Sequence, residues 1–188
     1  MNYVAVLVDG DCMPFVNELV AAGEPGGHQA SRLLKTSVRE YLRTKHPEVP
    51  DNVEITIGVY ANFGGLAYAY CDAQVIGDPT ELENFANGFN NEDALCEFVN
   101  ADGGKKYADE LLKAAFQMNF DNVQCHHIVF GGSADDRYAP LLGPYIDSDK
   151  ISLLQGPPFA KELAELATRY PIMECGAVLR KTGLATRK

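Results

Sequence analysis

The sequence predicts an α/β protein, a three-layer sandwich in which a mostly parallel five-stranded sheet is covered by helices on both faces. Two observations lead to this class. Short apolar runs recur along the chain, and segments with apolar residues at helical spacing separate them. The first run, residues 3–8, is apolar throughout instead of alternating with polar residues, which is typical of a strand buried on both faces.

The elements can be assigned in chain order from these patterns. The expected strands are residues 3–8, 53–60, 95–99, 127–130 and 151–154. The expected helices are residues 28–43, 65–75, 105–119, 138–142 and 159–170. Pro47 and Pro50 end the first helix. The Gly/Pro-rich segment 23–27 is expected as a turn, and the Gly/Asn-rich segment 84–93 as a polar connection.

Length and composition limit the class of protein. A chain of 188 residues with 46% hydrophobic residues is sufficient for one domain, which we place at residues 1–180, followed by a basic tail at 181–188. No apolar run approaches the roughly 20 residues of a membrane helix, and the first residues do not resemble a signal peptide. We therefore expect an intracellular protein, cytoplasmic or nuclear, without a membrane partner.

Cysteines and charge narrow the function. The five cysteines are scattered without a C-x-x-C pair, so we expect buried thiols and neither disulfides nor structural zinc. The formal net charge of −10 argues against a general nucleic-acid coat, because attraction to phosphate usually needs a positive field. It is compatible with an enzyme whose clustered carboxylates hold a divalent metal.

Open parallel sheets bind ligands beyond the carboxyl ends of their strands. Several carboxylates of this chain come just after the expected strands, and therefore at that edge. Asp9 and Asp11 follow the first strand, Asp102 the third, and Asp135 and Asp136 the fourth.

A further carboxylate, Asp109, lies at the rim of the apolar face of the helix 105–119, whereas Lys106, Glu110 and Lys113 lie on its outer face. A carboxylate at such a rim needs a partner. If Asp109 converges with Asp9 and Asp135, a hard cation such as Mg²⁺ or Mn²⁺ would relieve their repulsion. The alternatives are a turn at Asp9-Gly10 and a helix cap at Asp135 or Asp136.

Two polar residues could touch a substrate at the same edge. Asn62 follows the second strand, and Ser133 lies in a Gly-rich loop whose backbone N–H groups can hold a phosphate. The pair His126-His127 begins the fourth strand at the opposite end of the sheet, and adjacent strand residues point to opposite faces, so we do not expect it to bind a metal with the acidic cluster.

Three motifs resemble the NYN branch of the PIN-like nucleases. They are Val6-Leu7-Val8-Asp9-Gly10-Asp11, Lys106-x-x-Asp109, and the run from Val129 to Leu141 that contains Gly131-Gly132-Ser133-Ala134-Asp135-Asp136-Arg137-Tyr138. The order of segments, including residues 59–66, also resembles the NYN-like domain at the N-terminus of fungal CCCH zinc-finger proteins. The resemblance covers roughly residues 3–179. No CCCH pattern occurs in these 188 residues, so any zinc fingers lie outside this chain.

The resemblance implies a parallel sheet and a Mg²⁺ or Mn²⁺ site that cuts RNA. Asp9, Asp109 and Asp135 would be the catalytic metal ligands. Asp11 and Asp136 would add to the metal site or orient water, and Arg137 would contact the substrate phosphate, beside Asn62 and Ser133.

Two departures from the family pattern bear on activity. The usual Ser-Gly-Asp-Ser-Asp-Phe becomes residues 133–138 here, so Arg137 replaces the second Asp. The further acid often found later on the helix is absent around Lys113-Ala114-Ala115. Arg137 could therefore pair with Asp11 or Asp136 and quench the site instead of binding substrate.

The sequence leaves three functions open. The first is a metal-dependent endoribonuclease acting on single-stranded RNA. The second is a non-catalytic PIN-like scaffold, in one version a homodimer, that binds RNA or protein. The third is a haloacid-dehalogenase-like phosphatase, since Asp9-Gly10-Asp11 resembles that superfamily's nucleophile and acid/base pair, with Asp135-Asp136 holding Mg²⁺. Against the third, the second strand ends in Ala61-Asn62 and lacks the required Ser or Thr.

Overall fold

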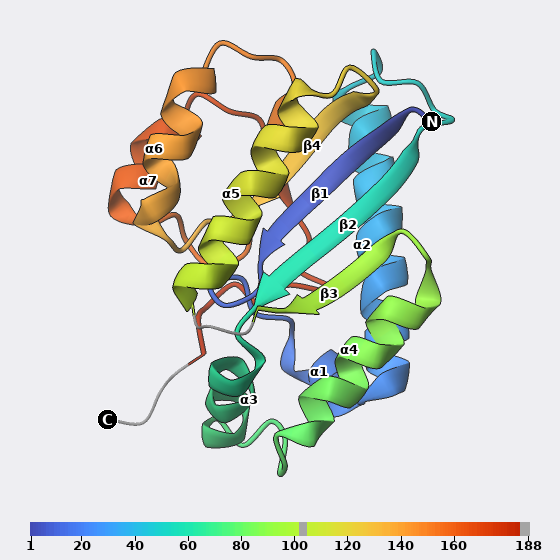
Figure 1. Ribbon diagram of the computed structural model, residues 1–188, viewed down its shortest axis with the longest axis vertical. Helices are drawn as coiled ribbons and strands as arrows, with labels where there is room; N and C mark the ends of the chain where they lie inside the picture. Colours follow the sequence, from blue (N-terminus) through green and yellow to red (C-terminus); the bar gives the residue numbers. More distant parts are fainter. Residues whose placement is uncertain (102–104, 185–188) are drawn as a thin grey trace.

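A single parallel sheet of six strands forms the centre of the molecule, in the order β3-β2-β1-β4-β5-β6 (Figure 1). The computed structural model describes residues 1–101 and 105–184. The strands are β1 (Tyr3–Asp9), β2 (Glu54–Ala61), β3 (Cys96–Asn100), β4 (Cys125–Gly131), β5 (Ile151–Gln155) and β6 (Ile172–Glu174). The predicted α/β class is confirmed, but the prediction of five strands is wrong, because β6 follows β5 at the sheet edge.

The helices connect these strands. They are α1 (Asn17–Ala21), α2 (Glu24–Lys45), α3 (Phe63–Asp72), α4 (Thr80–Glu92), α5 (Lys105–Asp121), α6 (Ala139–Leu142) and α7 (Lys161–Ala167), with 3₁₀ turns η1 (Asp136–Tyr138) and η2 (Gly143–Tyr145). Two expectations were wrong. Residues 24–27 already belong to α2, and most of the polar segment 84–93 belongs to α4, whose buried residues Leu82, Phe85 and Phe89 repeat at helical spacing.

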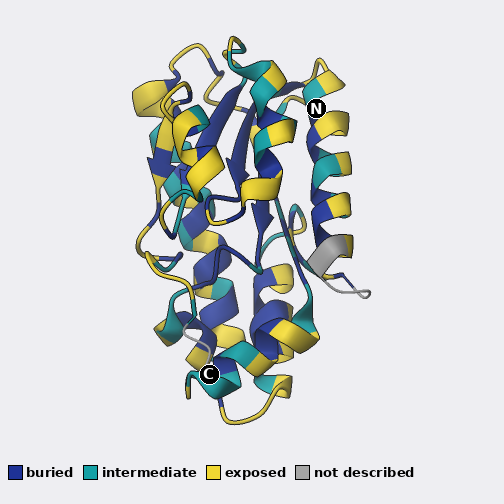
Figure 2. Cartoon of the chain, turned by 90° about the vertical axis from the view of Figure 1, so that its left-hand side faces the viewer, coloured by how far each residue is buried: buried dark blue, intermediate teal, exposed yellow. Residues whose placement is uncertain are grey.

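Helices cover both faces of the sheet, as the continuous apolar run of β1 predicts. On one face Val4, Val6 and Val8 pack with α1, α2 and α4. On the other face Ala5 and Leu7 pack with α5, α6 and α7. Figure 2 shows the strands buried between helices that expose only their outer sides. β1 therefore lies in the middle layer of a three-layer arrangement.

The strand order reverses between β1 and β4, which are neighbours in the sheet although β2 and β3 lie between them in sequence. All strands run in the same direction, so their carboxyl ends share one edge. A crevice at such a reversal is where open α/β sheets bind ligands. The segments after β1 and β4 therefore define the region in which to look for a site.

Two expectations from composition concern cysteines and membranes. The five cysteines are free thiols; four of them are buried and Cys71 is half-buried. No helix in the described ranges has both the length and the apolar character required to cross a membrane.

Candidate functional site

Asp9 ends β1 and is buried, with 2% of its surface exposed. Its Oδ1 accepts hydrogen bonds from the backbone N–H groups of Asp11 (2.9 Å) and Cys12 (3.3 Å), and its Oδ2 accepts one from the Tyr138 hydroxyl (2.6 Å). Burial raises the pKa of the Asp9 carboxyl, and these three hydrogen bonds oppose the rise. The nearby charge of Asp135 raises this pKa further.

Asp135 follows β4 and is held by Arg137, two residues further along the chain. Its Oδ1 accepts from the backbone N–H and from Nε of Arg137, both at 3.0 Å, and its Oδ2 accepts from Nε at 3.1 Å and from Nη2. Two parallel N–H···O contacts of this kind make a bidentate pair, the strongest arginine–carboxylate geometry. These bonds raise the pKa of Arg137 above its ordinary value.

Asp109 lies in α5 and is 4% exposed. Its Oδ2 forms an ion pair with Nζ of Lys113 at 3.0 Å and lies 3.9 Å from Nη1 of Arg137. Lys113 thus turns toward the site, which corrects its expected place on the outer face of the helix. The other oxygen, Oδ1 of Asp109, is buried and has no hydrogen-bond partner among the described residues.

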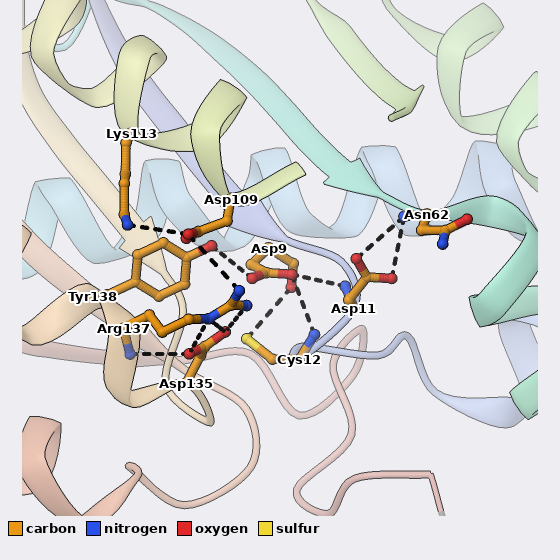
Figure 3. A network of polar contacts seen from close by, with 9 residues as sticks. All are labelled: Asp9, Asp11, Cys12, Asn62, Asp109, Lys113, Asp135, Arg137 and Tyr138. Atoms are coloured by element: carbon orange, nitrogen blue, oxygen red, sulfur yellow. Dashed lines mark hydrogen bonds and ion pairs between the residues drawn. The ribbon is translucent and has the colours of Figure 1, made fainter. Parts of the chain in front are cut away.

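The guanidinium of Arg137 lies between the carboxylates of Asp135 and Asp109, and the Tyr138 ring reaches past it toward Asp9 (Figure 3). Arg137 and Tyr138, adjacent in sequence, thus connect the three predicted carboxylates. The partners expected for Arg137, Asp11 or Asp136, were wrong. Its partners are Asp135 and, more distantly, Asp109.

Asp11 and Asn62, which follow β1 and β2, are joined by hydrogen bonds between the Asp11 carboxylate and the backbone of Asn62. The backbone N–H of Asn62 donates to both carboxylate oxygens of Asp11 at 3.2 Å. The Asn62 side chain instead caps α3 by accepting from the Gly65 N–H at 3.4 Å. Asp11 thus anchors the start of α3 next to the cluster.

Two predicted site residues serve the scaffold instead. Asp136 is exposed, and its Oδ1 accepts from the Glu162 N–H at 2.8 Å at the start of α7, so it does not face the cluster. Ser133 is buried and its hydroxyl donates to the Pro157 carbonyl at 2.7 Å. Asp135, whose Oδ1 accepts from the Arg137 N–H, is the cap of the following short helix η1 considered above, whereas Asp136 binds the start of α7 and Ser133 fixes the loop after β5. Asp102, and the side chain of Lys106, lie outside the described residues.

Tyr138 and Lys113 belong to the cluster but were not among the site residues predicted from the sequence. Tyr138 is fully buried, and burial together with the adjacent Asp9 charge raises the pKa of its hydroxyl. Its ring packs against Gly132, where a Cβ would lie 2.5 Å from the ring. The sequence signal for this contact was a glycine two residues after the expected strand 127–130, followed six residues later by a tyrosine.

The cluster does not form a ready metal site. Within residues 1–101 and 105–184, no three Asp, Glu, His or Cys side chains are grouped so that they could hold a metal ion. Mg²⁺ requires several oxygen ligands in near-octahedral geometry. Apart from Oδ1 of Asp109, the oxygens of the three carboxylates already accept hydrogen bonds or ion pairs from the protein. In the described arrangement, these residues do not fit a bound metal.

The fold and the cluster define a parallel α/β domain with buried carboxylates, two of them paired with Arg137 and Lys113, at the reversal of its strand order. Residues 1–179 match the family model described as a domain of unknown function, DUF7923, and the chain belongs to that family. No curated protein and no solved structure matches the chain.

Proposed function

We propose that this chain is a PIN-like domain that binds single-stranded RNA at the carboxyl edge of its sheet without cutting it. The observation that carries the non-catalytic part is the position of Arg137, bidentate on Asp135 and directed at Asp109. The resemblance of its motifs to NYN domains and the location of the cluster beside β1 and β4 support the RNA part.

The charges of the cluster are nearly balanced without a metal. Asp9, Asp109 and Asp135 contribute three carboxylates, and Arg137 and Lys113 contribute two cations at hydrogen-bond or ion-pair distance. A divalent ion would have to displace a guanidinium that makes several charge-assisted hydrogen bonds, which are roughly twice as strong as neutral ones. The protein's own side chains therefore provide the compensation that a metal provides in an active nuclease.

One observation favours a second candidate, a Mg²⁺- or Mn²⁺-dependent ribonuclease with Asp9, Asp109 and Asp135 as ligands. Oδ1 of Asp109 is a buried carboxylate oxygen without a hydrogen-bond partner among the described residues. Such a group is costly, and a cation is one way to satisfy it. The side chain of Arg137 is 40% exposed, so it has room to move away from Asp135.

The phosphatase has less support. Its nucleophile would be Asp9, but this carboxylate is almost fully buried and accepts three hydrogen bonds. Asp136, the second residue of its supposed Mg²⁺ pair, caps α7.

The test combines binding and cleavage of one labelled single-stranded RNA of mixed sequence. Binding is measured by fluorescence anisotropy in EDTA, and cleavage on gels in Mg²⁺ and in Mn²⁺, for the wild type and for Asp9→Asn. We expect retention of RNA in EDTA and no cleavage in either metal. Cleavage that needs both the metal and Asp9 would replace this proposal with the ribonuclease. Absence of both retention and cleavage would leave a protein-binding scaffold.

A further inference from the structure

A hollow of about 270 Å³ lies between the end of β3, the start of α3 and the helix α4. These three elements meet at the carboxyl edge of the sheet (Figure 1). The aromatic rings of Phe63 and Phe98 line it together with the side chains of Glu83, Asn87 and Asn100. None of the functional residues discussed above belongs to this hollow.

The hollow is held in shape by contacts among the strand and the two helices around it. The rings of Phe63 and Phe98 pack edge to face, with centroids 4.7 Å apart and planes at 75°. The backbone N–H of Phe63 donates to Oδ1 of Asn100 at 3.1 Å, which ties the start of α3 to the end of β3. Phe98 is buried, whereas Phe63 is half-buried and offers part of its ring to the hollow.

The Glu83 carboxylate of the hollow selects for hydrogen-bond donors, whereas the carboxamides of Asn87 and Asn100 both donate and accept. Glu83 and Asn87 are exposed and lie one turn apart on α4, so both can face the same ligand. Among the described residues, no lysine or arginine lines the hollow, and the carboxylate of Glu83 would repel a phosphate. A carboxylate accepts hydrogen bonds only, so the ligand must present N–H groups toward it.

We propose that this hollow is a nucleobase subsite that prefers guanine. An aromatic ring beside a carboxylate and carboxamides provides both stacking and recognition of a base edge, as single-stranded RNA is usually read. Guanine presents two adjacent donors, N1–H and N2–H, that match the two oxygens of one carboxylate. Uracil presents a single N–H between two carbonyl groups, which the Glu83 carboxylate would repel.

The position of the hollow fits a strand of RNA that also passes the acidic cluster. Asn100, Asn62 and Asp11 mark the ends of the neighbouring strands β3, β2 and β1. Adjacent strands are about 4.8 Å apart, so the end of β3 lies about 10 Å from the end of β1. That distance suits a base one or two nucleotides from the part of the RNA strand that passes the ends of β1 and β2.

The overall charge makes base recognition necessary if RNA is the ligand. The chain carries a net charge of −10, and the two cations of the cluster already pair with carboxylates. Attraction to the phosphate backbone is therefore weak, and affinity must come from stacking and base edges. The base subsite thus rests on the RNA binding proposed above.

The experiment is a two-dimensional ¹H–¹⁵N NMR titration of the labelled protein with guanosine 5′-monophosphate and, separately, with uridine 5′-monophosphate. We expect saturable shifts at the backbone of Phe63 and at the side-chain amides of Asn87 and Asn100, with at least about tenfold weaker binding of the uridine nucleotide. Glu83→Gln should remove this preference, and Phe63→Leu should weaken both nucleotides. Glu165→Gln, an exposed change on α7, is the matched control and should leave both titrations unchanged.

The outcomes separate this subsite from the RNA binding on which it rests. Equal affinities for the two nucleotides, or shifts confined to the cluster of Asp9 and Asp135, would overturn the subsite. If Glu83→Gln and Phe63→Leu leave the affinity for RNA unchanged, the subsite proposal is overturned and the RNA-binding proposal stands. Guanine-selective shifts in the hollow without retention of longer RNA would keep the subsite and overturn the RNA proposal. Because Glu83 is exposed, its variant tests the subsite even if Phe63→Leu does not fold.

Discussion

Arg137 lies between the carboxylates of Asp135 and Asp109 and neutralises part of their charge. Replacing it by Gln removes a positive charge and leaves Asp135 with a neutral partner, so the affinity of the cluster for Mn²⁺ should rise, by about tenfold. Isothermal titration of the apoprotein with MnCl₂ measures this change. Arg169→Gln is the control, because Arg169 is exposed and only distantly paired with Asp147. Unchanged Mn²⁺ affinity in Arg137→Gln would show that the guanidinium does not compete with metal.

Asp9 shows the cost of the cluster in stability. Its folded-state pKa is raised, mainly by burial, so the folded protein holds this proton more tightly than the unfolded chain does. The resulting stabilisation is complete below the unfolded value near 3.8 and is lost as the pH rises through the folded pKa. The ionised, buried carboxylate of Asp9 therefore lowers the free energy of unfolding.

Asp9→Asn should consequently raise the melting temperature at pH 7, by about 2–4 °C. The amide oxygen can still accept from the two backbone N–H groups of residues 11 and 12. The difference from wild type should shrink as the pH is lowered, because the raised pKa brings Asp9 toward its neutral form. Differential scanning calorimetry between pH 4 and 7 measures it, with the exposed Asp149→Asn as control. A melting temperature that falls equally at both pH values would mean that the hydrogen bonds outweigh the buried charge.

Part of the site followed from sequence at the level of single residues. Asp9 ends an apolar strand and Asp135 lies in the loop after another, and parallel strands end at one edge, so their proximity was predictable. The partner of Arg137 was not predictable. Its side chain can reach several carboxylates, and the backbone conformation of η1 determines which of them it contacts. Glu83 and Asn87 were missed for another reason. They belong to α4, most of which was predicted as a polar connection because of its Asn and Gly residues.

At the scale of elements, α2 and α4 pack so closely that two helical glycines are required. A Cβ at Gly88 would lie 1.9 Å from the Glu24 carbonyl oxygen, and one at Gly27 would lie 1.9 Å from the Phe85 carbonyl oxygen. These contacts are with backbone atoms, which cannot move without shifting a helix. The glycines therefore set the distance between α2 and α4, and with it the wall of the hollow formed by α4.

Gly88→Ala should destabilise the protein by about 3 kcal/mol, the upper part of the range for overpacking in a filled core. Urea unfolding measures the change in the free energy of unfolding. Gly143→Ala is the matched control, since a Cβ there meets no atom within 4 Å. Equal stability of the two variants would show that the helices can separate at little cost.

Strands were easier to predict than helices in this chain. Five of the six strands were located from runs rich in apolar residues, continuous in β1 and interrupted by polar residues in β2 and β3. β6 is only three residues long, too short for a pattern. The glycines of α2 and α4 were interpreted as breakers because sequence alone does not distinguish a glycine in a turn from one at a helix crossing. Tertiary packing determines that difference.

At the scale of the whole molecule, the end of the sheet opposite the site holds a buried polar network. His127 is 1% exposed, and its Nε2 lies 2.7 Å from Oγ of Ser152. That hydroxyl also contacts Nε2 of His46 at 3.1 Å and accepts from the Tyr41 hydroxyl at 2.8 Å. Burial lowers the pKa of His127 to about 3, and the neighbouring His46 adds to the effect.

The free energy of unfolding should therefore fall as the pH is lowered from about 6.5 toward 3. In this window the unfolded chain binds a proton at His127 and the folded protein does not, which gives a slope of up to ~1.4 kcal/mol per pH unit. His127→Gln removes this proton and should flatten the dependence measured by urea unfolding between pH 4.5 and 7. His126→Gln, one residue earlier in β4 and half-buried, is the control and should keep the wild-type slope. A slope that His127→Gln leaves intact would place the acid sensitivity in other groups.

The last described segment of the chain is joined to the loop that follows β1. Val16 donates to the Val178 carbonyl, Arg180 donates to the Pro14 carbonyl, and Phe15 and Leu179 form an isolated antiparallel bridge. The start of β1 at Tyr3 lies at the other end of the same strand. The two ends of the described chain are therefore on opposite sides of the molecule (Figure 1). Immobilising the protein on a sensor surface through its first residue would leave the carboxylate cluster facing the solution. A fluorophore on the exposed Lys181 would instead sit on the side of the cluster and report by energy transfer on whatever binds there.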